Sequence, residues 1–359
     1  MGRSAVVCGI GSFLPPGLLT NNELAARLGV TEEWIRSRTG IDSRRVLSPG
    51  SATSDLAVEA GRRALASAGN PTVDAVILAT TTPDHLCPAT APDVATRLDL
   101  GCVPAFDLSI ACAGFLYGLA TASGLIASGS AHTVLLIAAD SFTTIVDPMD
   151  RGCAVVFGDG AGAVVLRSGR SGEPGAVTVP VLGSDGGGSH LIQVPAGGSR
   201  QKPSGETPKP EERFLHMQGR MTFRHAVERM TESSRMALER AGWQPGDVDR
   251  LGAHQANARI VDAVADQLGI TEERGLSNIA GVGNTGAGSI PLLLSQSIAD
   301  GALRPGHRLL LTAFGAGFGW GATTMVWPEL GPCRGADLSD GIDGSGSDLM
   351  DEPTGRSRP

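Results

Sequence analysis

The hydrophobic positions of this chain fall into short apolar runs separated by longer amphipathic stretches. Six runs predict buried strands, at residues 5–10, 75–80, 134–138, 163–166, 308–312 and 323–326. Helical spacing of apolar residues recurs between them, for example over 53–68, 221–241 and 258–268. An alternation of buried strands and helices predicts an α/β fold built in layers.

A weak internal repeat runs through this pattern. The segment 65–69 (LASAG) resembles the segment 238–242 (LERAG), and an aspartate and a hydrophobic strand follow each copy. Phe157-Gly158 and Phe314-Gly315 each precede a strand rich in small residues. The repeat offset is close to half of the first 330 residues, which predicts two copies of one βα unit. Chance similarity between small residues is the alternative.

The boundaries of these units follow from the same pattern. We predict an N-terminal half over 1–170 and a C-terminal half over 171–330. A polar loop rich in proline and glycine over 196–213 is long for a connection, so we expect a functional flap or a mobile segment. After residue 330 the pattern dissolves, and the Gly-, Ser-, Asp- and Pro-rich stretch 331–359 predicts a disordered tail.

Composition narrows the class of protein. The chain has 359 residues, 41% of them hydrophobic, and a net charge of −8. This charge argues against a nucleic-acid partner, whereas coenzyme A needs only a local basic rim. No segment resembles a signal peptide, and we expect no membrane partner because no apolar run reaches the roughly 18 residues of a span.

The cysteines indicate a reducing compartment. There are six, at Cys8, Cys87, Cys102, Cys112, Cys153 and Cys333. None forms a C-x-x-C pair, and a chain of this size does not need disulfide bonds for stability. We therefore expect a cytoplasmic protein, and we expect neither a metal site nor a bound cofactor.

Cys112 is the most informative residue. It follows an extended apolar stretch and opens a small-residue segment, 111–124, that predicts a buried helix. A helix N-terminus offers free backbone N–H groups and a positive dipole end, which favour the nucleophilic thiolate. An inert buried cysteine is the alternative, because buried cysteines are common.

Three later turns carry candidate chemistry. His254-Gln255-Ala256-Asn257 follows a short strand, the glycine-rich segment 281–289 containing Asn284 precedes a helix, and the segment 314–321 precedes the last strand. Chemistry in α/β folds gathers at such strand ends. A structural histidine, a tight turn and a backbone crossing are the respective alternatives. The glycine spacing does not match a dinucleotide-binding fingerprint.

Together these motifs resemble β-ketoacyl-[acyl-carrier-protein] synthase III. The resemblance rests on the order of Cys112, the His254 motif and the Asn284 motif, with a further segment over 33–41, and it covers about residues 3–328. It implies a duplicated thiolase-like α-β-α-β-α fold, a homodimer, and a catalytic triad of Cys112, His254 and Asn284.

The resemblance also implies the rest of the site. An oxyanion hole would use the backbone N–H groups of Cys112 and Ala316. The other implied residues are coenzyme A contacts at Trp34, Arg38, Arg151, Gly219 and Asn257, acyl-pocket residues Cys87 and Phe314, and carrier-protein contacts at Arg224 and Arg259. Coenzyme A phosphates suit arginine forks, and adenine suits the face of a tryptophan. Without the resemblance, each of these residues would be assigned an ordinary structural role, such as a core contact or a surface salt bridge.

The implied reaction is a decarboxylative condensation of acyl-CoA with malonyl-[acyl-carrier protein] through an acyl-Cys112 intermediate. Two positions depart from the family: Cys87 stands where a bulky side chain is frequent, and Gly286 where serine is frequent. These departures affect the expectation of which acyl group is bound and leave the expected type of reaction unchanged. The alternatives are an acyltransferase that does not condense, which the retained Asn284 disfavours, and a non-catalytic partner, which the retained Cys112 disfavours.

Overall fold

Two separate β-sheets with the same internal order carry the fold. The computed structural model describes residues 3–202, 205 and 207–330. The first sheet has the strand order β1 (Arg3–Phe13), β7 (Asp159–Arg170), β6 (Thr133–Ser141), β4 (Ala75–Ala79) and β5 (Ala105–Leu108). The second sheet has the order β8 (Val181–Ser184), β13 (Gly319–Val326), β12 (Arg308–Gly315) and β11 (Arg250–Ala253).

Four strands of the first sheet have counterparts in the second. In the first sheet β1, β7 and β6 pair antiparallel, and β6, β4 and β5 pair parallel. In the second, β8, β13 and β12 pair antiparallel, and β12 pairs parallel with β11. A parallel bridge between Leu251 and Gly275 stands at the place of a fifth strand. This correspondence supports the repeat found in the sequence.

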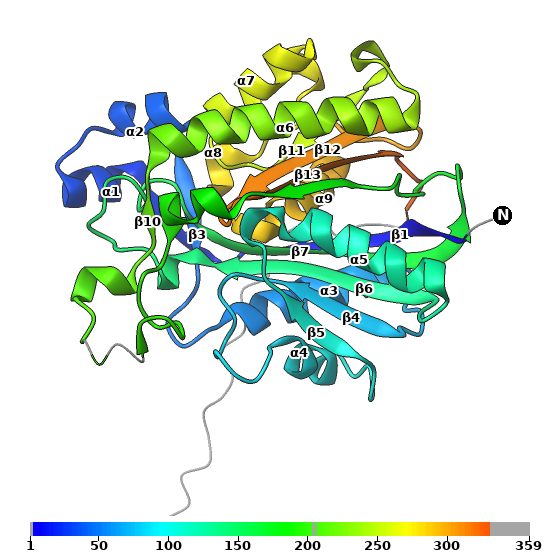
Figure 1. Ribbon diagram of the computed structural model, residues 1–359, viewed down its shortest axis with the longest axis horizontal. Helices are drawn as coiled ribbons and strands as arrows, with labels where there is room; N and C mark the ends of the chain where they lie inside the picture. The colour runs from blue at the N-terminus through cyan, green and yellow to red at the C-terminus, as the bar shows by residue number, and fades with distance from the viewer. Residues whose placement is uncertain (1–2, 203–204, 206, 331–359) are drawn as a thin grey trace, which may run out of the picture.

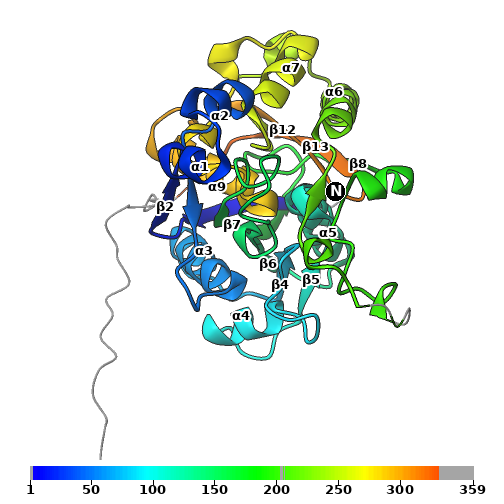
Figure 2. The ribbon, with the colours of Figure 1, turned by 90° about the vertical axis from the view of Figure 1, so that its left-hand side faces the viewer.

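Helices complete five layers (Figure 1). They are α3 (Thr53–Ser67), α4 (Ala91–Arg97), α5 (Gly114–Ser128), α6 (Gly219–Ala241), α7 (Ala258–Leu268) and α9 (Ser289–Ala299). α3 and α4 contact the first sheet, and α6 contacts the second sheet and α7. α5 and α9 contact strands of both sheets and lie between them, which Figure 2 shows end-on. The fold is therefore the expected thiolase-like α-β-α-β-α arrangement.

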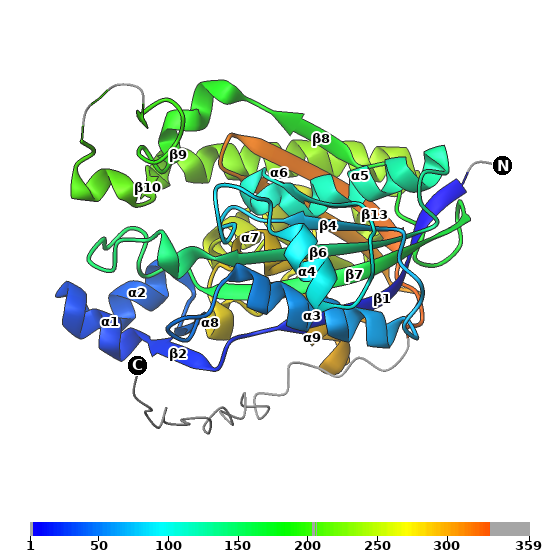
Figure 3. The ribbon, with the colours of Figure 1, turned by 90° about the horizontal axis from the view of Figure 1, so that it is seen from below.

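Smaller elements cover one end of the layers. They are β2 (Gly17–Thr20), α1 (Asn21–Leu28), α2 (Glu32–Thr39), β3 (Ser43–Val46), β9 (Ile192–Gln193), β10 (His216–Met217) and α8 (Ile279–Val282). β9 and β10 pair into a short ribbon that carries the polar loop 196–213. Figure 3 shows this ribbon at the same end of the molecule as α1 and α2.

The sequence pattern located the main elements and missed the short ones. All six predicted strands and the three helical examples are present, most of them longer than expected. The strands β2, β3, β8, β9 and β10, of two to four residues each, were not predicted. The boundaries 1–170 and 171–330 stay predictions, and the predicted tail 331–359 lies outside the described residues.

The central helix α5 corrects one expectation. Ala111–Ser128 is an 18-residue helical stretch of mean hydropathy 1.4, so an apolar run of membrane-spanning length does exist. More than half of it, 56%, is buried within the protein. A helix between two sheets has no polar face to present to water, and for this reason α5 and α9 are apolar nearly all round.

A buried arginine joins the small end elements to the layers. Arg44 on β3 is fully buried and donates hydrogen bonds to the carbonyls of Leu19 (3.2 Å) and Val155 (2.8 Å) and to Asn21 Oδ1 (2.9 Å). Burial lowers the pKa of the guanidinium to about 10, so it remains charged at neutral pH. Its cation thus holds the two-stranded sheet of β2 and β3 against the segment that contains Val155.

We expect Arg44→Met to lower the free energy of unfolding by about 2–3 kcal/mol, because it leaves buried carbonyls without a charged donor. Urea unfolding followed by circular dichroism measures this. The neighbouring Arg45→Met is the control, since Arg45 is partly exposed and makes one long bond to Pro16 O, at 3.5 Å. Equal losses in the two variants would contradict the assignment.

Candidate active site

A sharp backbone turn presents Cys112. β5 ends at Leu108, Ala111 takes a left-handed φ of +45°, and a 3-10 turn over Ala111–Ala113 leads into α5. A non-glycine residue in this conformation is strained, which is typical of functional turns. Gly315 packs against the turn, and a Cβ on Gly315 would lie 2.7 Å from the Cys112 nitrogen. Only glycine allows this close approach of the two halves.

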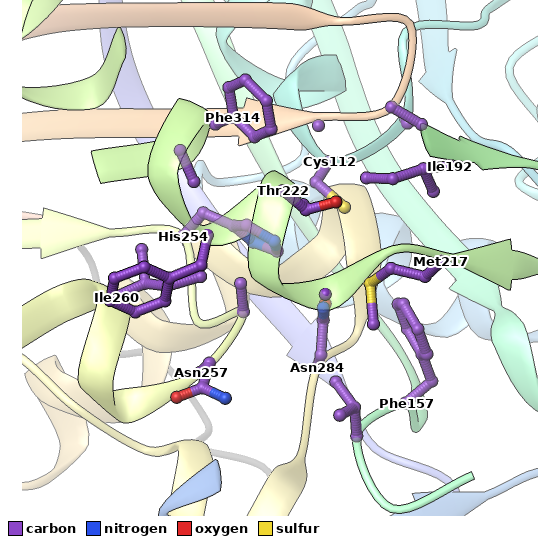
Figure 4. A pocket seen from close by; sticks show the side chains of 18 of the residues that line it. Cys112, Phe157, Ile192, Met217, Thr222, His254, Asn257, Ile260, Asn284 and Phe314 are labelled. Carbon is purple, nitrogen blue, oxygen red and sulfur yellow. The ribbon is translucent and has the colours of Figure 1, made fainter. Parts of the chain in front are cut away.

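One buried cavity brings together the three predicted catalytic residues. Cys112, His254 and Asn284 all line a cavity of about 140 Å³, together with Phe314 and Ala316 (Figure 4). The three side chains come from the start of α5, the end of β11 and the turn before α9. These segments lie far apart in the sequence, and only the packing of the two sheets around α5 and α9 places them on one cavity.

The amide of Asn284 has a fixed orientation. Its Oδ1 accepts a hydrogen bond from Gly286 N–H at 3.0 Å, and its backbone N–H donates to Val156 O at 2.9 Å. Because Oδ1 is occupied, the amide NH₂ is the end left to face the cavity. Gly286 has a φ of +58°, and a Cβ there would lie 2.2 Å from Asp140 Oδ2 and from Phe142. A side chain at position 286 therefore clashes with these neighbours.

The turn that carries His254 is equally constrained. The His254 backbone N–H donates to Thr312 O at 2.9 Å, and the ring Nδ1 lies 3.0 Å from Ser289 Oγ. Gln255 is buried, and its amide NH₂ donates to the carbonyls of Ala253 (2.9 Å) and Leu276 (3.4 Å). The imidazole is consequently held in one place, with Nε2 as its remaining polar atom.

Burial sets the protonation of the site. It raises the pKa of the Cys112 thiol to about 12, with a smaller contribution from the charge of Asp140. It also lowers the pKa of His254 to about 3. Both groups are thus neutral at pH 7, and the expectation of a thiolate favoured by the helix N-terminus is wrong. Desolvation outweighs the backbone hydrogen bond at Cys112, which acts in the opposite direction on the pKa of the thiol.

A buried carboxylate joins the turns around the cavity. Asp140 at the end of β6 accepts hydrogen bonds from Thr81 N–H at 2.6 Å and from Ala287 N–H at 2.8 Å. Burial raises its pKa to about 6, which leaves it mostly ionised at pH 7. Thr81 lines the cavity, and Ala287 follows the Asn284 turn. Asp140 therefore fixes two walls of the cavity that belong to different halves.

A second cavity of about 510 Å³ leads to the first. The five predicted coenzyme A contacts and both predicted carrier contacts line it: Trp34, Arg38, Arg151, Gly219, Asn257, Arg224 and Arg259. Gly219 and Asn257 also line the catalytic cavity, so the two spaces adjoin. Arg220 is a fifth arginine on this mouth. The mouth is thus strongly basic on a chain whose net charge is −8.

Some of these side chains already have partners. The Arg38 guanidinium lies 4.7 Å from the ring centroid of Trp34, and the half-buried indole also packs against an apolar cluster. Asn257 caps α7, with Oδ1 accepting from Arg259 N–H at 3.0 Å and Nδ2 donating to Arg38 O at 2.9 Å. Asn257 therefore shapes the wall of the tunnel as well as facing it.

Sequence reasoning missed most of the apolar lining. Phe142 and Phe157 stack with their centroids 4.6 Å apart, and both line the catalytic cavity. Further lining residues are Ile192, Leu215, Met217, Thr222, Phe223, Ala226, Met230 and Ile260. Several of them, such as Ile192 and Leu215, flank the polar loop 196–213. Because this region was predicted to be a polar loop, the apolar residues beside it were not singled out.

Cys87 is not part of the cavity within one chain. It is exposed and lies on a loop beside Leu86, which is 80% exposed. The family resemblance implies that Cys87 borders the acyl pocket across the dimer, and this expectation stays a prediction. Within residues 3–202, 205 and 207–330, no three His, Cys, Asp or Glu side chains group as a metal site would require.

Comparison with known proteins gives the family. The family model described as 3-oxoacyl-[acyl-carrier-protein (ACP)] synthase III matches residues 106–186 of this chain. The model for the C-terminal part of the same family matches residues 238–327. The chain is 54% identical to β-ketoacyl-[acyl-carrier-protein] synthase III 5 of Streptomyces coelicolor, covering 92% of this chain and 99% of that one. The Pseudomonas aeruginosa synthase III is 49% identical over 92% of this chain and 99% of its own length.

Solved structures agree with these sequence matches. The crystal structure of synthase III from Pseudomonas aeruginosa superposes with a TM-score of 0.86 at 48% identity, covering 92% of this chain and 100% of that one. The priming β-ketosynthase of the R1128 polyketide pathway gives a TM-score of 0.84 at 34% identity, covering 91% and 97%. The fold thus defines a thiolase-like acyltransferase. More particularly, the chain belongs to the β-ketoacyl-[acyl-carrier-protein] synthase III family.

The raised pKa of Cys112 predicts how its reactivity depends on pH. Only the thiolate attacks iodoacetamide, so the alkylation rate of Cys112 should rise about tenfold per pH unit from pH 7 to pH 10, with no plateau. Peptide mass spectrometry follows Cys112 separately from Cys102, which is exposed. A rate that levels off below pH 8 would show that the resting enzyme holds a thiolate.

Proposed function

We propose that the cavity loads an acyl group from acyl-CoA onto Cys112 and then condenses it with malonyl-[acyl-carrier protein]. The observation that carries this proposal is that a thiol and two fixed polar side chains open on one buried cavity beside an arginine-lined mouth. The product would be a 3-ketoacyl-[acyl-carrier protein], which initiates a fatty acid or a polyketide.

In the first half-reaction Cys112 reacts through its thiolate fraction, after the thiol proton passes to solvent. The Cys112 sulfur attacks the thioester carbonyl, and the tetrahedral oxyanion is stabilised by the backbone N–H groups of Cys112 and Ala316. Support for this hole comes from Gly315, whose close approach sets the chain of Ala316 beside Cys112. When the tetrahedral intermediate collapses, the carbon–sulfur bond to coenzyme A breaks. The released coenzyme A thiolate takes up a proton from solvent, which balances the proton that Cys112 lost.

The second half-reaction needs hydrogen-bond donors more than a base. Loss of CO₂ from the malonyl thioester places negative charge on the thioester oxygen as the enolate forms. His254 and Asn284 would donate N–H bonds to that oxygen. The enolate carbon then attacks the acyl carbonyl, and the bond to Cys112 breaks. The departing sulfur takes up one proton from solvent, since its pKa is about 12.

The basic mouth suits both substrates. Arg38 and Arg151 would bind the phosphates of coenzyme A, and Trp34 would contact the adenine. Gly219 and Asn257 would line the path of the pantetheine arm. Arg224 and Arg259 would attract an acidic carrier protein, because a basic rim on an acidic chain focuses the field at the tunnel.

A homodimer with two-part active sites completes the proposal. The halves 1–170 and 171–330 would contribute Cys112 and the pair His254 and Asn284 respectively. The exposed Leu86 favours burial of the Cys87 loop against a second copy, where Cys87 would border the acyl pocket. A reducing compartment such as the cytoplasm would keep Cys112 as a free thiol.

The rival activity is acyl transfer without condensation. The fixed NH₂ of Asn284 disfavours it, because simple transfer forms no enolate that would need a second donor. Incubation with acyl-CoA and malonyl-[acyl-carrier protein] separates the two. Release of CO₂ with a 3-ketoacyl product supports condensation, whereas acyl transfer to a hydroxyl or a carrier without CO₂ supports the rival.

We expect Cys112→Ala to abolish acyl-enzyme formation, because no other cysteine among the described residues lines the cavity. Intact-protein mass spectrometry after mixing with acyl-CoA shows the adduct. Cys102→Ala should label as the parent protein does. Labelling that persists in Cys112→Ala would mean that another residue is the nucleophile.

Asn284→Ala should slow decarboxylation about a hundredfold while Cys112 acylation changes less than about threefold, because its donor acts only on the enolate. Rapid-quench mass spectrometry and CO₂ release measure the two steps separately. Asn278→Ala is the matched control, since Asn278 pairs with Gln296 and does not line the cavity. Equal losses in both steps would remove the assigned role of Asn284.

Arg151→Ala should raise the KM for acyl-CoA about tenfold with little change in kcat, because a phosphate contact binds the substrate without touching the reacting carbonyl. Steady-state kinetics with acyl-CoA as the varied substrate give both constants. Arg62→Ala is the control, as Arg62 is paired with Glu59 on α3 and lies outside the mouth. An unchanged KM would place coenzyme A elsewhere.

A further inference from the structure

The hydroxyl of Ser289 has an unusual position at the centre of the site. Ser289 is the first residue of α9, is buried, and does not itself line the catalytic cavity. Its Oγ lies 2.8 Å from Gln255 N and 3.0 Å from His254 Nδ1. Among the described residues these are its two hydrogen-bond partners, and both belong to the turn that carries the imidazole.

The hydrogen on this hydroxyl has one place to go. Gln255 N–H is a donor, so it fills one lone pair of Ser289 Oγ. The hydroxyl hydrogen then needs an acceptor, and the other partner of Oγ is His254 Nδ1. If Nδ1 carried a proton instead, the hydroxyl hydrogen would be left buried without an acceptor, which folded proteins avoid.

We propose that Ser289 is a positioning residue that fixes the tautomer of His254, with Nδ1 unprotonated and Nε2–H facing the cavity. A neutral imidazole with this tautomer is a hydrogen-bond donor toward the substrate and cannot accept the Cys112 proton at the same nitrogen. The donor role of His254 in decarboxylation then depends on Ser289, a consequence that rests on the proposed function.

Further hydrogen bonds hold the turn that carries His254 and Gln255 in one conformation. Gln255, whose N–H selects the hydroxyl orientation, is itself anchored through its side chain to Ala253 and Leu276. His254 N–H is bound to Thr312 on β12. No carboxylate is hydrogen-bonded to Nδ1 among the described residues, so nothing in the site favours an imidazolium.

Nitrogen-15 NMR of histidine-labelled protein tests the tautomer directly and needs no activity. The His254 resonances, assigned by their loss in His254→Gln, should show a protonated Nε2 and an unprotonated Nδ1 at pH 7. The opposite pattern, or a doubly protonated ring, would overturn the proposal. A failed condensation assay would leave this result intact, so the two ideas fail separately.

Variants connect the tautomer to the reaction. Ser289→Ala should convert the single His254 tautomer to a mixture and slow decarboxylation about tenfold, with Cys112 acylation nearly unchanged. Ser289→Thr, which keeps the hydroxyl, should restore both. Ser295→Ala is the matched control, because Ser295 is a buried serine of the same helix whose hydroxyl pairs with Ser12 at 2.9 Å. Equal effects of Ser289→Ala and Ser295→Ala on decarboxylation would reduce Ser289 to a structural residue.

Discussion

Two hydrogen bonds decide which atoms face the catalytic cavity. Gly286 N–H occupies the oxygen of Asn284, and Ser289 Oγ occupies Nδ1 of His254. Each bond removes an acceptor from the reaction and leaves a donor. The rest of the architecture serves these two contacts, because α9 and the turn before it bring Gly286 and Ser289 between the sheets, and Asp140 holds the next residue of that turn.

Burial explains why the donors can act without charge. The cavity lies among turns from both halves of the chain, and desolvation there keeps both the Cys112 thiol and the His254 imidazole neutral. A neutral site costs the fold little, whereas a thiolate–imidazolium pair in the same place would have to be desolvated. During the reaction negative charge develops on the substrate, first on the tetrahedral oxyanion and then on the enolate, and fixed N–H groups face it in each case.

The layers could be predicted from local patterns, and the resemblance carried by three short motifs pointed to the residues that meet at one cavity. α6 and α7 have apolar stripes at helical spacing, and Cys112, His254 and Asn284 stand in short motifs at strand ends. β8 was missed because four residues at a sheet edge carry little periodic signal. The thiolate expectation failed because the burial of Cys112 arises from contacts with the other half, such as Gly315, that no local pattern reveals. Asp140 and Ser289 escaped notice for a similar reason, since an aspartate at a strand end and a serine at a helix start have many ordinary uses.

The most direct measurement of the central claim is CO₂ release from malonyl-[acyl-carrier protein] by Cys112→Ala between pH 7 and pH 9. This variant isolates the enolate-forming step from acyl transfer. If both donors are neutral, we expect the rate of CO₂ release to stay constant between pH 7 and pH 9, because neither His254 nor Asn284 changes its protonation there. A rate that falls tenfold for each unit of rising pH would mean that a protonated imidazolium does the work, and would contradict the account.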